Sequence, residues 1–316
     1  TSGGDAPGMN AAIRAVVRTA NYHKIECVGV RGGYTGLIEG NFTKMGPRSV
    51  SNIINLGGTI LRSARSKEFR TEEGRQKAFE QCQKNGIDAL VCIGGDGTFT
   101  GAKIFAEEFG VKVIGVPGTI DNDIYGTDFT IGYDTALNTA MEAIDKISDT
   151  ATSHNRVFFI EVMGRDAGFI ALNSGIASGA LDILIPEKKD SLEDLFETFE
   201  KAQKRGKTSS IVIVAEGERL ASTYELAEQT KQRFPDYDIR VSILGHIQRG
   251  GAPSCADRVL ASRMGYGAVV GLMKGLTNVM AGIRSNDLVF TPIEDAIRKH
   301  NEINQDLLQI AEILSM

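Results

Sequence analysis

The sequence has no long apolar run, no cluster of basic residues and no recognisable signal peptide. None of its hydrophobic stretches approaches the roughly 18–20 residues that a membrane-spanning helix needs. The net charge is −5 and the arginines are dispersed, whereas a nucleic-acid surface requires clustered Lys and Arg. These absences argue against a membrane protein and a general nucleic-acid binder. They predict a cytoplasmic globular chain whose 316 residues suffice for two domains.

The cysteines and histidines lack the spacings that bind metals. The four cysteines contain no CxxC pair, which favours reduced and mostly buried thiols. The four histidines show no metal-ligand spacing, and we expect His23 and His300 at the surface. Neither residue type predicts a metal centre of its own.

Short apolar runs alternate with segments of helical periodicity along most of the chain. The segments 75–84, 135–150 and 192–206 are typical of helices. This alternation predicts a doubly wound α/β fold with mainly parallel sheets, and a second unit of the same kind begins near residue 135. The predicted strands are 27–30, 89–93, 112–116, 157–162, 183–185, 210–214 and 240–244.

Three glycine-rich turns carry the residues best suited to phosphate chemistry. Residues 94–98 read Gly-Gly-Asp-Gly-Thr after one predicted strand, and residues 117–123 read Pro-Gly-Thr-Ile-Asp-Asn-Asp after the next. A third turn, residues 1–10, opens a predicted helix, and its position predicts a short strand before residue 1. Glycines let a backbone approach phosphate oxygens, and a helix N-terminus favours negative charge. We expect these turns to form one site, with Asp121 as general base and Asp96 as metal ligand.

Five motifs in register resemble the bacterial 6-phosphofructokinase family, whose members phosphorylate fructose 6-phosphate. They are TSGGDAPGMNAAIR at the start, GGDGT, PGTIDND, MGR at 163–165 and GHIQRGG at 245–251. The resemblance extends from Thr1 to about residue 300. It implies ATP as phosphoryl donor, Mg²⁺ as cofactor and a homo-oligomer, expected to be a tetramer.

The resemblance also implies a division into two Rossmann-like domains with the active site in the cleft between them. An ATP-binding domain would comprise residues 1–132 and 250–299. A fructose 6-phosphate-binding domain would comprise residues 133–249 and 300–316.

The matching positions imply a role for each reacting group. Asp121 would take the proton from the sugar 1-hydroxyl, and Thr119 would donate a hydrogen bond to the phosphoryl group in flight. Asp96 would hold Mg²⁺ between the β- and γ-phosphates, and Asp123 would help to orient the site. The transition state is loose and electron-rich, so it also needs cations. The matching arginines are Arg65 and Arg165.

The resemblance supplies a binding set for each substrate. Converging Arg and His donors suit the 6-phosphate dianion, and in the family two of the arginines reach across from a neighbouring subunit. The ATP-site positions are Gly4, Tyr34, Arg65, Ser66, Arg70, Gly95, Asp96, Gly97 and Thr98, with Ser66 standing where some relatives carry an aromatic residue. The sugar-phosphate positions are Thr119, Asp121, Asp123, Arg156, Met163, Gly164, Arg165, Glu216, Arg240, His246 and Arg249, of which Arg156 and Arg240 would be donated in trans.

Two glycines indicate the phosphoryl donor. Pyrophosphate-using members of the superfamily resemble this chain but carry Asp in place of Gly97 and Lys in place of Gly118. Larger charged side chains there would intrude on the α-phosphate and ribose of a nucleotide, so the glycines predict ATP. A pyrophosphate-dependent phosphofructokinase is the alternative. A lipid or NAD kinase would leave PGTIDND unexplained, and a non-catalytic nucleotide-binding subunit would be expected to lack Asp121, Asp96 or Arg165.

The regulatory positions depart from the family. Family effector sites bind ADP or phosphoenolpyruvate at a subunit interface through a basic cluster, and Arg14, Arg18 and Lys207 retain part of it. Two arginines and a metal-binding glutamate of that cluster are replaced, so we expect weak or altered allosteric control. The replacing residues are Leu56, Ser148 and Leu181.

Overall fold

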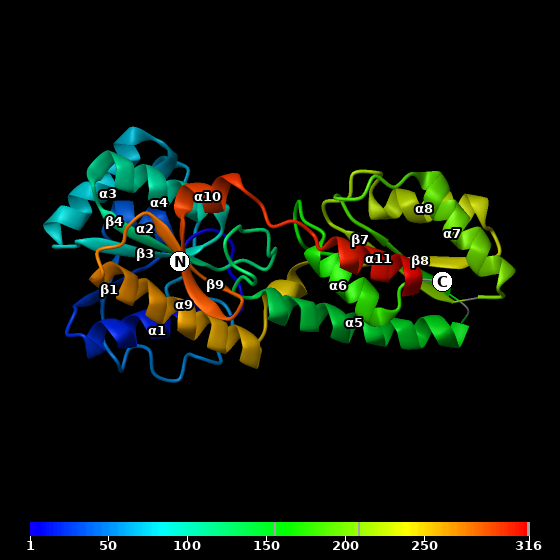
Figure 1. Cartoon of the computed structure of the whole chain (residues 1–316), viewed down its shortest axis with the longest axis horizontal. Helices are drawn as coiled ribbons and strands as arrows, with labels where there is room; N and C mark the ends of the chain where they lie inside the picture. Colours follow the sequence, from blue (N-terminus) through cyan, green and yellow to red (C-terminus); the bar gives the residue numbers. More distant parts are fainter. Residues whose placement is uncertain (155, 208, 315–316) are drawn as a thin grey trace. The chain divides into compact units, whose positions relative to one another are not determined.

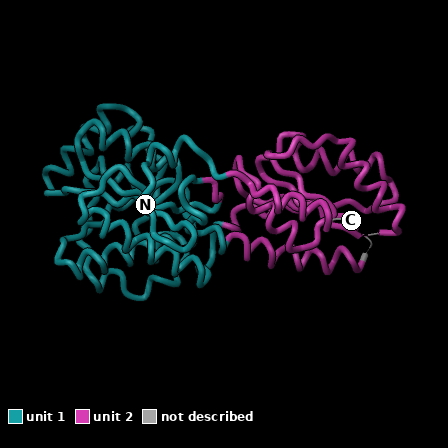
Figure 2. The backbone as a smooth tube through the Cα atoms, in the orientation of Figure 1, with its two compact units in different colours: residues 1–120, 124–135, 249–301 teal, residues 121–123, 136–248, 302–316 magenta. Residues whose placement is uncertain are grey.

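The computed structural model describes residues 1–154, 156–207 and 209–314, and these fall into two compact units (Figure 2). Unit 1 comprises residues 1–120, 124–135 and 249–301, and unit 2 comprises residues 121–123, 136–248 and the segment from residue 302 onward. The short segment 121–123 groups with unit 2.

Unit 1 is built around a four-stranded sheet of order β10-β9-β4-β3 (Figure 1). In this sheet β3 (Ala89–Gly94), β4 (Lys112–Pro117) and β9 (Val279–Arg284) are parallel, and β10 (Asp287–Pro292) is an antiparallel edge strand. One face is covered by α1 (Met9–Tyr22) and α9 (Cys255–Met273), and the other by α4 (Asp96–Phe109) and α10 (Ile293–Arg298). The remaining elements are β1 (Cys27–Val30), α2 (Gly33–Glu39), β2 (Phe42–Met45), η1 (Glu68–Arg70) and α3 (Glu72–Lys84).

Unit 2 contains a four-stranded parallel sheet of order β6-β7-β5-β8. Its strands are β5 (Arg156–Val162), β6 (Asp182–Leu184), β7 (Ser210–Ala215) and β8 (Asp238–Ile243). α6 (Phe169–Ser178) packs on the sheet with α11 (Gln305–Leu314) against it, and α8 (Thr223–Arg233) packs on the sheet next to α7 (Leu192–Lys204). Right-handed crossovers place α7 and α8 on the face opposite α6. The unit also contains most of α5 (Tyr133–His154) and η2 (Gly245–Arg249).

Local sequence explains why these elements form. β7 reads SIVIVA and all six of its residues are buried, as expected for a parallel strand covered on both faces. α7 begins with a capping box, in which Ser191 accepts from the N–H of Asp194 and the Asp194 carboxylate accepts from the N–H of Ser191. The predicted α/β architecture with mainly parallel sheets is confirmed, and each of the seven predicted strands is present.

One predicted strand pairs differently from the parallel arrangement. β1 pairs antiparallel with β2 in a separate two-stranded sheet. The connection, residues 31–41, carries the short helix α2 and is shorter than the dozen or more residues of a parallel crossover. β2, β9 and β10 were not predicted; β9 and β10 form a hairpin whose turn residues, Ser285 and Asn286, are both left-handed. None of the described helices is long and apolar enough to cross a membrane.

Candidate active site

The turns that follow β3 and β4 lie side by side at one edge of the unit 1 sheet. The two strands are parallel with Gly94 opposite Pro117, so both turns begin at the carboxyl end of the sheet. The N–H of Gly118 donates to the carbonyl of Gly94 at 3.0 Å. Open α/β sheets bind ligands outside the carboxyl ends of their strands. The structure therefore brings together the two acidic turns that the sequence analysis assigned to one site.

The N-terminal turn joins the same edge. The N–H of Ser2 donates to the carbonyl of Ile93 at 3.2 Å, and Thr98 Oγ1 donates to the carbonyl of Ser2 at 3.0 Å. A Cβ at Gly94 would lie 2.4 Å from Thr98 Oγ1 and 2.6 Å from the Ser2 carbonyl oxygen. Only glycine allows this approach. α4 begins at Asp96 in this turn, and a helix N-terminus is suited to phosphate.

The two glycines that predicted ATP have different surroundings. A Cβ at Gly97 would meet none of the described atoms within 4 Å, and Gly97 is exposed. A Cβ at Gly118 would lie 3.2 Å from Met9 Cε and 3.3 Å from Ile93 Cγ2. A side chain at position 97 would therefore extend into open space outside the turn, while one at position 118 would press on the core.

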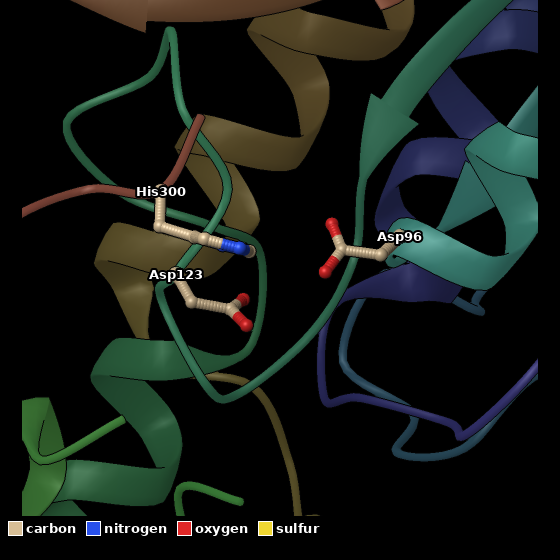
Figure 3. A group of neighbouring side chains, drawn as sticks. All are labelled: Asp96, Asp123 and His300. Carbon is tan, nitrogen blue, oxygen red and sulfur yellow. The ribbon is translucent and has the colours of Figure 1, made fainter. Parts of the chain in front are cut away.

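Asp96, Asp123 and His300 form a group of potential metal ligands (Figure 3). One ligand atom of each lies within 4.8 Å of the others. His300 is placed here because its backbone forms an antiparallel bridge with Ile124, the residue after Asp123. Carboxylate oxygens suit Mg²⁺, and imidazole is a common ligand of other divalent cations. The donor set fits a divalent cation, and the sequence analysis missed His300 because a single long-range bridge leaves no sequence signal.

The loop after β4 is braced by the chain segment that follows it. Thr130 Oγ1 donates to the carbonyl of Thr119 at 2.7 Å, and the N–H of Ile131 donates to the carbonyl of Pro117 at 2.9 Å. Asp121 is 7% exposed. Thr119, the residue assigned to the phosphoryl contact, thus lies on a backbone held by hydrogen bonds.

Tyr34, assigned to the nucleotide, supports the Gly94–Thr98 turn from the protein interior. Its hydroxyl donates to the carbonyl of Thr98 at 2.5 Å, and its ring stacks on Phe69 with centroids 4.0 Å apart. Burial raises the pKa of Tyr34 well above its ordinary value, so the hydroxyl remains a donor. This geometry matches a packing role for the residue.

Most of the nucleotide positions outside this turn are exposed. Ser66 Oγ accepts from the N–H of Phe69 at 3.2 Å, and Arg65 and Arg70 on either side are exposed. Gly4 is exposed, and a Cβ there would lie 3.0 Å from Nη1 of Arg249.

Arg249, assigned to the sugar phosphate, contacts the N-terminal turn. Its Nη1 donates to the carbonyl of Asp5 at 3.3 Å. The guanidinium of Arg249, the last residue of η2, therefore lies beside Gly4 in unit 1.

In unit 2, sugar-phosphate positions gather at the carboxyl ends of the strands. The N–H of Arg165, after β5, donates to Oε2 of Glu216, after β7, at 3.3 Å. The N–H of Met163 donates to Oε1 of the buried Gln248 at 3.3 Å. Arg165 has φ 55, a left-handed conformation that is rare outside glycine and is often found at functional sites. The exposed His246 follows β8 at the same edge, and Gly164 precedes Arg165.

Arg156 and Arg240 lie away from that edge. Both contact the Asp238 carboxylate, Arg156 through Nε at 2.8 Å and Arg240 through Nη2 at 3.0 Å. Arg156 holds the pKa of Asp238 below its ordinary value, with a smaller effect from Arg240. Arg156 begins β5 and Val162 ends it, so six strand steps of about 3.3 Å put about 20 Å between the arginine end and the Met163 end.

The chain matches the family model described as phosphofructokinase over residues 1–272. It belongs to the phosphofructokinase family. It is 55% identical over 316 residues to ATP-dependent 6-phosphofructokinase 2 of Bacteroides thetaiotaomicron, a match that covers 100% of this chain and 97% of that protein.

Solved structures of phosphofructokinases share this fold. A phosphofructokinase from Saccharomyces cerevisiae matches with a TM-score of 0.90 and 37% identity, over 94% of this chain and 44% of that one. A pyrophosphate-dependent phosphofructokinase from Marinobacter aquaeolei matches with a TM-score of 0.84 and 22% identity, over 99% and 89% of the two chains. At that identity the second match shows the fold alone.

Two residues that the sequence analysis assigned to an effector site line a cavity of about 570 Å³ in unit 2. Leu181, Lys207 and Asp182, the first residue of β6, lie in its wall. Burial raises the pKa of Asp182 to about 6 and lowers the pKa of Lys207. Arg14 and Arg18 lie on α1 in unit 1. Leu181 is buried and brings no carboxylate, but its neighbour Asp182 does.

Proposed function

We propose that this chain is an ATP-dependent 6-phosphofructokinase of glycolysis. It transfers the γ-phosphoryl group of ATP to the 1-hydroxyl of D-fructose 6-phosphate and releases fructose 1,6-bisphosphate and ADP. The observation that carries the proposal is 55% identity along the whole chain to an enzyme of that name. The adjacent turns at the carboxyl ends of β3 and β4 support it, since they offer glycines, a helix N-terminus and carboxylates at one edge.

Each reacting group has a residue in the proposed mechanism. Asp121 accepts the proton of the 1-hydroxyl as the oxygen attacks, and Thr119 bonds the transferring phosphoryl group. Arg65 and Arg165 brace the negative charge that spreads over the phosphoryl oxygens. When bound, Mg²⁺ would neutralise the β- and γ-phosphates, and Asp96 would hold it with Asp123 close by.

The two substrates divide between the units in this proposal. Unit 1 binds ATP and unit 2 binds fructose 6-phosphate. Arg156 and Arg240 serve a neighbouring subunit, an assignment supported for Arg156 by the distance of about 20 Å between its end of β5 and the Met163 end. The working form is therefore a homo-oligomer, expected to be a tetramer in the cytoplasm.

The proposal also includes allosteric control that is weaker than in the family. Lys207, Arg14 and Arg18 keep part of a basic effector site, but Leu181 adds no metal ligand. Phosphoenolpyruvate and Mg-ADP should therefore shift the fructose 6-phosphate saturation curve weakly. A strong shift by phosphoenolpyruvate in an active preparation would overturn this part.

A coupled assay of fructose 6-phosphate with ATP, and then with pyrophosphate, tests the function. We expect turnover with ATP and background rates with pyrophosphate; the reverse would identify the pyrophosphate-dependent alternative. Asp121→Asn should lower kcat by about 10²–10⁴-fold, the usual contribution of a general base. The exposed Asp128, on the same loop, provides a matched control as Asp128→Asn. Equal activities of the two variants would remove Asp121 from the mechanism.

A further inference from the structure

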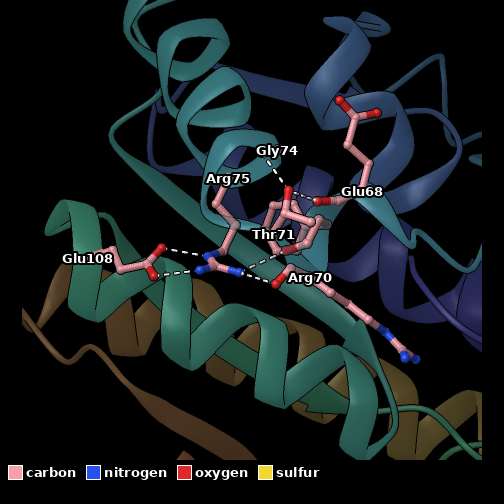
Figure 4. A network of polar contacts seen from close by, with 7 residues as sticks. Glu68, Arg70, Thr71, Gly74, Arg75 and Glu108 are labelled. Carbon is pink, nitrogen blue, oxygen red and sulfur yellow. Dashed lines mark hydrogen bonds and ion pairs between the residues drawn. The ribbon is translucent and has the colours of Figure 1, made fainter.

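Arg75 is a buried cation without a role in the proposed chemistry (Figure 4). It lies on α3, and its guanidinium pairs with Glu108 near the end of α4, Nε to Oε2 at 2.5 Å and Nη2 to Oε1 at 2.6 Å. Its Nη1 donates to the carbonyls of Phe69 and Arg70 at 3.2 and 2.8 Å. Arg75 holds the pKa of Glu108 below its ordinary value, so the carboxylate stays charged. One guanidinium thus joins α3, α4 and η1.

η1 is also fixed by the start of α3. Thr71 Oγ1 donates to the carbonyl of Glu68 at 2.9 Å and accepts from the N–H of Gly74 at 3.1 Å. A Cβ at Gly74 would lie 2.1 Å from the Glu68 carbonyl oxygen, so the first turn of α3 packs directly on η1. The short helix that carries Arg70 therefore takes its orientation from α3.

The opposite side of η1 contacts the beginning of α4. Phe69 stacks on Tyr34, whose hydroxyl bonds the Thr98 carbonyl in the phosphate-binding turn. α4 thus holds η1 at both ends, through Tyr34 at its start and through Glu108 and Arg75 at its end. A change at the Arg75 pair would be transmitted to the segment that carries Arg70.

We propose that Arg75, held by Glu108, is a positioning residue for the nucleotide: it fixes the Arg70 backbone so that the Arg70 side chain reaches ATP. In Figure 4 the Arg70 carbonyl faces Arg75, and the Arg70 guanidinium extends away from it. A guanidinium suits this task because its planar fork of five donors serves a carboxylate and two carbonyls at once, which an ammonium does not match. The inference rests on the proposed function, which makes Arg70 a nucleotide contact.

The first test separates the two substrates. Arg75→Met should raise KM for ATP about tenfold, the factor expected when one charge-assisted contact is lost. KM for fructose 6-phosphate and kcat should change less than about twofold, because in this proposal η1 contacts the nucleotide and not the sugar phosphate. Arg75→Lys should give a smaller rise. A folded Arg75→Met with unchanged KM for ATP, or with both KM values raised together, would overturn the proposal.

Lys77→Met is the matched control. Lys77 lies on α3 and pairs with Glu68 of η1 at 2.8 Å, but both side chains are more than half exposed. Exposed pairs contribute little, so this variant should keep the wild-type KM for ATP. A rise equal to that of Arg75→Met would show that any contact between α3 and η1 has the same effect, and would overturn the specific role of Arg75.

A double-mutant cycle with Arg70→Ala tests whether Arg75 acts through Arg70. If it does, adding Arg75→Met to Arg70→Ala should raise KM for ATP less than about twofold further. A full tenfold additional rise would refute transmission through Arg70. Should Arg75→Met fail to fold, Glu108→Gln replaces it in the same cycle, because it keeps a neutral acceptor for Arg75 while weakening the pair. A wild-type KM in that variant would count against the proposal.

Direct binding keeps this inference separable from the proposed function. Calorimetric titration with a non-hydrolysable ATP analogue and Mg²⁺ measures the nucleotide site without turnover. Weaker binding to Arg75→Met than to Lys77→Met would support the positioning role even if fructose 6-phosphate is not phosphorylated. Failure of the wild type to phosphorylate fructose 6-phosphate would refute the function alone.

Discussion

The close packing of the N-terminal turn against the Gly94–Thr98 turn predicts opposite outcomes for two glycines three residues apart. Gly94→Ala places a Cβ 2.4 Å from Thr98 Oγ1 and 2.6 Å from the Ser2 carbonyl oxygen. Thr98 can rotate away, but Ser2 presents backbone, so the turn must shift. Gly97→Ala adds a Cβ that meets none of the described atoms within 4 Å.

The magnitudes follow from these contacts. Overpacking costs about 1–3 kcal/mol, and loss of the Thr98 to Ser2 hydrogen bond adds about 1 kcal/mol, so Gly94→Ala should destabilise unit 1 by about 2–4 kcal/mol. For a unit of this size the melting temperature should fall by about 5–15 °C. Gly97→Ala should be neutral or stabilising by up to about 1 kcal/mol, because alanine favours a helix over glycine.

The assays are thermal unfolding and ATP saturation of both variants. A shifted turn misplaces the phosphates, so Gly94→Ala should also lower kcat/KM for ATP by about 10–100-fold. Gly97→Ala should retain the wild-type value. The reasoning is refuted if Gly94→Ala melts within about 1 °C of the wild type and binds ATP normally, or if the two variants behave alike.

Three further predictions concern the donor, a buried acid and the proposed trans arginines. Gly97→Asp should raise KM for ATP at least about tenfold while Gly97→Ala does not, because a carboxylate would extend toward the nucleotide phosphates. The folded pKa of Asp182, about 6, lies above its ordinary 3.8, so protonation favours the fold and stability falls as pH rises from about 4 to about 6. In urea titrations at pH 7.5, Asp182→Asn should therefore have a free energy of unfolding up to about 3 kcal/mol higher than the wild type. Near pH 4 the two free energies should be equal, and a difference independent of pH would contradict this. Arg240→Met should raise KM for fructose 6-phosphate about 10–100-fold with KM for ATP unchanged, and equal effects on both substrates would argue against its role.

The sequence predicted the parallel strands well because their signal is local. β7 is a continuous apolar run, and β3 and β4 each end in glycine-rich turns. In the hairpin of β9 and β10, which was missed, β10 is only half-buried and its apolar run is three residues long. The available clue in the sequence was Asn286, because Asn is among the residues that tolerate the left-handed conformation that Ser285 and Asn286 adopt in this turn.

The sequence could not predict contacts between side chains that are far apart in the chain and close in space. Arg75 and Glu108 are 33 residues apart on different helices, and neither position differs from an ordinary surface charge in the sequence. His300 joins Asp96 through one backbone bridge to Ile124. Asp121 and Asp96 were assigned first from the chemistry of their turns and the other motif residues by resemblance, and their individual roles stay predictions.

The separation of the two ends of β5 has a consequence for how the protein should behave on dilution. If Arg156 and Arg240 complete a neighbour's sugar-phosphate site, then a lone subunit lacks two of its phosphate ligands however well it is folded. Specific activity would then fall with protein concentration below the dissociation constant of the assembly and recover on reconcentration. Turnover would serve as a direct gauge of quaternary structure.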